Sequence, residues 1–195
     1  ILTGIVVSYW NTLYVLIISF TASLISLILA AVLRVSGYNK IRTLTYSKQF
    51  KEVLQLDEYK DRFQEIYLKR LWGDGNSVSG YGSTMNATSE IRGWLINNIP
   101  KQEIKKIVDA PCGDFFWMKD VLSKVNVNYH GFDIVPQLIK SNLQNYGSEN
   151  VKFSVGDICE DWLPECDILL VRDCLFHLSF QDISRFLQNI QKVRF

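Results

Sequence analysis

The sequence predicts an α/β fold in which helices cover both faces of a mostly parallel β-sheet. From Lys105 onward, short apolar segments alternate with amphipathic segments of helical length. The fourth apolar segment, Ile168–Val171, shows no alternation of polar and apolar residues. Such a segment is typical of a strand that is buried on both faces. This order of elements predicts a three-layer domain whose functional site lies at the carboxyl ends of the strands.

The expected elements follow one another without long gaps in the second half of the chain. Strands are predicted over residues 105–110, 127–134, 151–158 and 166–173, and helices over 115–125, 136–147 and 179–193. Strands separated by helices of this length imply right-handed crossovers and therefore about four parallel strands. A further helix over residues 90–99 is expected to stop before Pro100, because the residue before a proline disfavours helical backbone.

The N-terminal part of the chain is uncharged. Residues 1–33 contain no Asp, Glu, Lys, Arg or His, and Leu13–Leu33 is long enough to cross about 30 Å of hydrocarbon as a helix. Arg34, Lys40 and Arg42 follow, so the positive-inside rule predicts a single-pass membrane protein whose domain is cytoplasmic. The transmembrane segment is therefore placed within residues 1–35. The alternatives are an apolar helix buried in a larger assembly and upstream sequence wrongly translated onto the domain.

Residues 36–78 are predicted to form an amphipathic helical linker, and residues 79–195 a partial domain. Apolar residues recur at helical spacing between Ser47 and Trp72, which indicates a helix, broken at most once, that packs against the domain. Association with a membrane surface is the alternative. The loop over residues 73–90 is long and rich in glycine. Loops of this length are usually functional or disordered, and here we expect a lid that covers a substrate or cofactor, with simple disorder as the alternative.

Composition argues against two classes of site. The chain has 21 Lys and Arg against 20 Asp and Glu, so it offers no global positive field and no nucleic-acid partner is expected. The four cysteines form no C-x-x-C pair and there are only two histidines, so no metal site is expected. The cysteines are interpreted as reduced and mostly buried.

Each predicted strand carries an aspartate at or near its end: Asp109, Asp133, Asp157 and Asp173. One such acid can cap the next helix. Four carboxylates at one edge of a sheet would repel one another unless a ligand rich in hydrogen-bond donors or positive charge lies among them. The strand ends therefore predict a ligand of that kind.

A dinucleotide is one candidate, since Asp133 lies 24 residues after Asp109, close to where an acid holds ribose hydroxyls. The turn after the first strand argues against it. Pro111 replaces the first glycine of the phosphate-binding pattern and has no N–H, only Gly113 remains, and Asp114 puts a negative charge where a phosphate would bind.

The segments "VDAPCGDFFWM", "YHGFDI", "VGDI" and "VRDCLFHLS" resemble the class I S-adenosylmethionine-dependent methyltransferases, over about residues 80–193. Pro111 and Phe115 depart from that family's usual glycines. The resemblance implies a Rossmann-like methyltransferase sheet with S-adenosylmethionine as cofactor. The implied cofactor-binding residues are Asp109, Ala110, Pro111, Cys112 and Gly113 near the methionyl group, Asp133 and Ile134 at the ribose, Asp157 and Ile158 at the adenine, and Asp173 and Cys174 near the methyl group.

Methyl transfer from an activated sulfonium depends mainly on placing the acceptor, so no metal or obligatory nucleophile is required. Asp173 is a candidate catalytic residue, and His177 is the histidine nearest the strand ends, able to serve as a base for a hydroxyl acceptor. The alternative for His177 is packing or capping at the start of the last helix.

The sequence thus predicts methyl transfer to an unidentified acceptor. A complete fold of this family has seven strands, so the chain is interpreted as a fragment whose fourth strand would have an open edge. An NAD(P)-binding oxidoreductase and a non-catalytic methyltransferase-like remnant are the alternatives.

Overall fold

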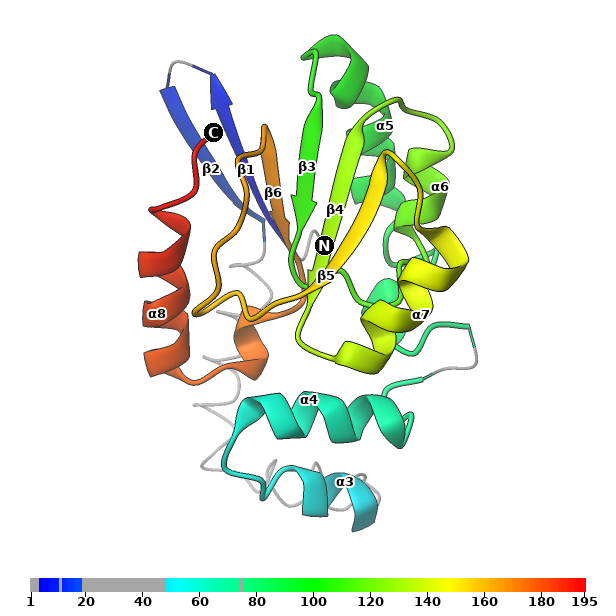
Figure 1. The fold of residues 1–195 in the computed structure, drawn as a ribbon, viewed down its shortest axis with the longest axis vertical. Coiled ribbons are helices and arrows are strands. Elements are labelled where there is room, and N and C mark those ends of the chain that lie inside the picture. Colours follow the sequence, from blue (N-terminus) through cyan, green and yellow to red (C-terminus); the bar gives the residue numbers. More distant parts are fainter. Residues whose placement is uncertain (1–3, 11, 19–47, 74–75) are drawn as a thin grey trace, which may run out of the picture.

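The structure is a computed structural model that describes residues 4–10, 12–18, 48–73 and 76–195. In these residues six strands form one mixed sheet in the order β2-β1-β6-β3-β4-β5, with helices on both faces (Figure 1). The strands are β1 (Gly4–Trp10), β2 (Thr12–Ile18), β3 (Lys106–Asp109), β4 (Asn128–Asp133), β5 (Val151–Val155) and β6 (Ile168–Val171).

The parallel part of the sheet has the four strands that the sequence predicts. β3 lies between β4 and β6, and β5 pairs with β4 on the far side, all in parallel register. Consecutive residues of β3 and β6 face opposite layers, because side chains alternate along a strand. Ile107 and Ile168 pack on one face, and Val108 and Leu169 pack on the other. The three-layer α/β prediction is therefore confirmed.

The N-terminal hairpin corrects two predictions. Leu13–Ile18 belongs to strand β2 and not to a transmembrane helix, and β1 pairs antiparallel with β6, so the edge of β6 is covered. Val, Ile and Tyr are frequent in this stretch and favour strands. Without β1, the edge of β6 would leave backbone N–H and C=O groups unpaired, and pairing with β1 satisfies them.

The rest of the predicted transmembrane segment, residues 19–33, lies outside the described residues. In the described part of the chain no helix is long and apolar enough to cross a membrane. The membrane location stays a prediction.

Helices cover the two faces unequally. α5 (Ser89–Lys101), α6 (Met118–Leu122) and α7 (Pro136–Tyr146) pack on one face, and α8 (Phe180–Ile190) packs on the other (Figure 1). α5 includes Pro100 in its last turn, because burial of Ile99 in the core outweighs the local preference of a residue before proline. α6 begins at Met118, three residues later than the predicted start at Phe115.

Two of the described helices follow the hairpin in the chain and lie beyond the carboxyl ends of the parallel strands. α3 (Lys48–Val53) and α4 (Tyr59–Leu68) are separated by a break, and Figure 1 shows α4 crossing below the ends of β3 and β4. Tyr59 and Ile66 are the buried residues of α4. This helix therefore faces the edge of the sheet at which the aspartates converge.

Candidate functional site

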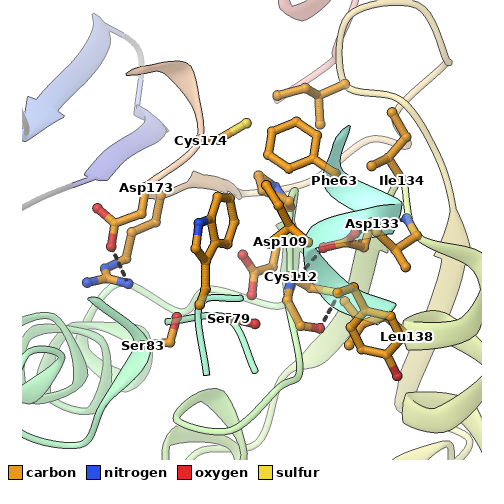
Figure 2. Close-up of a pocket in the computed structure, with 18 of the residues that line it drawn as sticks. Phe63, Ser79, Ser83, Asp109, Cys112, Asp133, Ile134, Leu138, Asp173 and Cys174 are labelled. Carbon is orange, nitrogen blue, oxygen red and sulfur yellow. Dashed lines mark hydrogen bonds and ion pairs between the residues drawn. The ribbon is translucent and has the colours of Figure 1, made fainter. Parts of the chain in front are cut away.

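A cavity lies at the carboxyl edge of the parallel strands, between the strand ends, α4 and the segment around Ser79 (Figure 2). All four strand-end aspartates line it. The other predicted cofactor-binding residues that line it are Pro111, Cys112, Gly113, Ile134, Ile158 and Cys174. Ala110 is fully buried and does not line the cavity; its N–H donates to the carbonyl of Leu170.

Asp109 is 2% exposed and accepts a hydrogen bond of 2.7 Å from the Tyr129 hydroxyl. Burial raises the pKa of the Asp109 carboxyl to about 7, although Tyr129 and the positive charge of Arg172 oppose the shift. This carboxyl is therefore close to the midpoint of its titration at neutral pH.

Asp133 is held by the backbone on both sides. Its carboxylate accepts hydrogen bonds of 3.1 Å from the N–H of Gly113 and from the N–H of Val135. Burial raises the pKa of Asp133 to about 6, and the backbone N–H donors limit that rise. These bonds fix the orientation of the carboxylate at the end of β4.

Asp157 is bound to α4 instead of facing only the cavity. Its carboxylate accepts a hydrogen bond of 2.5 Å from the Tyr59 hydroxyl and pairs with Lys60 at 2.9 Å. Burial alone would raise the pKa of Asp157, but the bonds from Tyr59, Lys60 and the Cys159 N–H bring it below its ordinary value. Asp157 thus stays ionised and anchors α4 over the site.

The turn after β3 has its backbone donors occupied. Pro111 has no N–H, the Cys112 N–H donates to the Phe132 carbonyl, and the Gly113 N–H donates to Asp133. The Asp114 N–H donates to the Ser79 hydroxyl at 3.0 Å. A phosphate group needs such N–H groups directed toward it, so this turn makes a poor phosphate cradle.

The segment Ser77–Ser83, named the strap here, lies across the strand ends, and its residues Val78, Ser79 and Ser83 line the cavity. The Asp114 carboxylate accepts a 2.8 Å hydrogen bond from the Val78 N–H. A side chain at Gly82 would collide with the Asp173 carboxylate, and one at Gly113 would collide with Ser79. The strap is thus fastened to the ends of both β3 and β6, in the region where the sequence predicts a lid.

His177 does not line the cavity. Its ring stacks on Trp72 with centroids 4.7 Å apart and lies edge-on to Phe63 at 6.1 Å. Burial lowers the pKa of His177 to about 4, so its imidazole is neutral at pH 7. This environment matches the packing alternative, whereas a direct catalytic role for His177 stays a prediction.

Sequence reasoning missed Arg172 and the aromatic wall of the cavity. Arg172 is 8% exposed, pairs with Asp173 at 2.9 Å and donates a 2.7 Å hydrogen bond to the Gly82 carbonyl. A charged residue directly after the apolar strand Ile168–Val171 was an available signal. The aromatic residues of the wall are Tyr59, Phe63, Tyr67, Trp72 and Trp117.

No protein-family model matches the chain, and no curated protein matches it. Among solved structures, it is similar to human N-acetylserotonin methyltransferase in complex with S-adenosylmethionine. The identity is 20% and the TM-score 0.50, over 79% of this chain and 44% of the human one. It is also similar to magnesium protoporphyrin IX methyltransferase from Synechocystis PCC 6803, with 14% identity and a TM-score of 0.53 over 72% of this chain and 74% of that one. The chain therefore has the class I S-adenosylmethionine-dependent methyltransferase fold and spans less than half of the human enzyme.

Proposed function

We propose that this protein binds S-adenosylmethionine and transfers its methyl group to an acceptor. The observation that carries the proposal is the ring of four aspartates around one cavity in a methyltransferase fold. S-adenosylmethionine has positive charge on its sulfonium and its amine and has no phosphate. It therefore complements carboxylates at a turn whose N–H groups are already engaged.

The residues present fit this cofactor. Asp133, at the end of β4, suits the ribose hydroxyls, and Ile158 offers an apolar edge for the adenine. Asp109 and the turn through Gly113 suit the methionyl group, while Asp173 and Cys174, which line the cavity just after β6, suit the methyl group and the acceptor. The bound sulfonium supplies an activated methyl group, so the protein has mainly to hold the acceptor in line with it and exclude water.

Asp173 is the better candidate for a direct role toward the acceptor. It lines the cavity, whereas His177 is packed between aromatic rings. An acceptor hydroxyl or amine that binds beside Asp173 can hydrogen-bond to the carboxylate, which orients its lone pair.

The oxidoreductase alternative is disfavoured, because the Gly113 and Asp114 N–H groups already bind Asp133 and Ser79. Isothermal titration of the full chain with S-adenosylhomocysteine and with NAD distinguishes the two functions. We expect saturable binding of S-adenosylhomocysteine, weakened at least roughly tenfold by Asp133→Asn. The control Asp167→Asn alters a carboxylate that holds Lys105 and Lys106 outside the cavity and should leave the affinity unchanged.

Binding of NAD without S-adenosylhomocysteine would contradict the proposal. A methyl-transfer assay distinguishes an active enzyme from a non-catalytic remnant that only binds the cofactor. Incubation with S-adenosylmethionine carrying a labelled methyl group and candidate acceptors should give a labelled product in the wild type and less in Asp133→Asn. Binding without any transfer would favour the remnant.

A further inference from the structure

Arg172 places a buried positive charge in a cavity dominated by carboxylates. Among the described residues that line the cavity, it alone has a cationic side chain. Its guanidinium lies beside Asp173 and 5.8 Å from the centre of the Trp117 ring, and its charge acts on Asp109. Burying an arginine at 8% exposure is costly unless its charge is compensated.

The position of Arg172 in the cavity is as informative as its charge. Figure 2 shows Asp173, which pairs with Arg172, and Ser83 at one side of the cavity, with Asp133, Ile134 and Leu138 at the other. Asp109 lies between them. A ligand whose ribose binds at Asp133 therefore extends its other end past Asp109 toward Arg172.

We propose that Arg172 forms a subsite for the carboxylate of the ligand's amino-acid tail and so selects nucleosides that carry an α-amino acid. This inference rests on the proposed function. The tail of S-adenosylmethionine carries a carboxylate, which the ionised aspartates of the cavity would repel. Arg172 offsets that repulsion, because a guanidinium binds a carboxylate through two parallel N–H groups. The aspartates remain available for the amine and the sulfonium.

The competing explanation is that Arg172 only fastens the strap, through the Gly82 carbonyl. The two roles differ in what they predict for ligands that lack the carboxylate. A fastening role affects every ligand of the cavity alike, whereas a carboxylate subsite affects only ligands that carry this group.

Calorimetric titration of the full chain with three probes makes this comparison. The probes are S-adenosylhomocysteine, its decarboxylated analogue, which keeps the amine, and 5′-methylthioadenosine, which lacks the whole tail. In Arg172→Gln we expect S-adenosylhomocysteine to bind roughly 10- to 100-fold more weakly, with the other two probes changed less than about threefold. Arg172→Lys keeps the positive charge but not the planar guanidinium. Its affinity for S-adenosylhomocysteine should therefore lie between that of the wild type and that of Arg172→Gln.

Arg92→Gln is the matched control. Arg92 also pairs with an aspartate, Asp120, and donates to a backbone carbonyl, that of Met85, but it does not line the cavity. It should leave the affinity for all three probes unchanged. Binding of 5′-methylthioadenosine shows that a variant is folded, and Arg172→Lys provides the comparison if Arg172→Gln does not fold.

Two results would overturn the inference: equal losses for all three probes in the Arg172 variants, or an unchanged affinity for S-adenosylhomocysteine. Failure of the wild type to bind any of the three would instead contradict the proposed function. The two failures are thereby distinguishable.

Discussion

The ionisation of Asp109 is linked to folding, because its carboxyl is buried. Burial raises its pKa from 3.8 to about 7, so between these values the folded protein holds a proton that the unfolded chain releases. The stability of the protein without ligand should therefore fall as the pH rises through this window. Asp109→Asn removes the titration but keeps a side chain that can accept the Tyr129 hydrogen bond.

For this variant we expect the melting temperature to fall less than that of the wild type between pH 5 and pH 8. At pH 8 the variant should melt higher, by roughly 2–4 °C for each 1 kcal/mol that the ionised carboxylate costs. Asp133, with a pKa of about 6, keeps part of the pH dependence in the variant. Thermal unfolding followed by circular dichroism at several pH values measures these melting temperatures. If the melting temperatures of the two proteins change with pH in parallel, Asp109 does not cause the pH dependence.

At the scale of the elements, the strap depends on the carboxylate of Asp114. It accepts the N–H of Val78 at 2.8 Å and the N–H of Phe116 at 3.2 Å. Asp114→Ala leaves both donors without this acceptor, which typically costs about 1–3 kcal/mol for a buried group. The strap should then separate more often from the end of β3.

Chymotrypsin can report that separation, because Tyr81 in the strap is 72% exposed. In Asp114→Ala we expect cleavage after Tyr81 to be several-fold faster than in the wild type, and a bound ligand should slow it. Asp167→Ala is the control, since Asp167 accepts two backbone N–H groups as well, from Lys105 and Lys106, at the other end of β3. Equal acceleration in both variants would indicate general destabilisation instead of an opened strap.

At the scale of the whole molecule, the parts of the fold that are coded locally were predictable. Continuous apolar runs such as Ile168–Val171 identify buried strands, and an aspartate after each run places a carboxylate at the sheet edge. The hairpin over residues 4–18 was not predictable in this way. Its pairing with β6 joins segments more than 150 residues apart, and an apolar run fits a strand as well as a helix.

The same limit applies to the site. The strand-end aspartates could be predicted because each follows its own strand, whereas the contact between Tyr59 and Asp157 joins residues 98 positions apart. The place of His177 behind Trp72 also depends on where α4 and the segment after it pack. Spacing in the sequence brings His177 near Asp173, but tertiary packing places its ring against Trp72 and Phe63, and His177 does not line the cavity.

The hairpin also determines how the sheet ends, and this leads to a prediction about β6. β1 pairs with β6 from Ile5–Val171 to Ser8–Ile168, so β6 has strand partners on both sides. Val7→Pro removes a backbone N–H from β1. Because β1 lies between β2 and β6, the substitution breaks a hydrogen bond to one of these two strands. We expect faster amide exchange across Ile168–Val171 and more self-association on size-exclusion chromatography, because an exposed strand edge pairs with other chains.

Val15→Pro, in β2, is the matched control: β2 pairs with β1 and not with β6, so exchange in β6 should change much less. Equal exchange in β6 for both variants would show that β1 does not protect it.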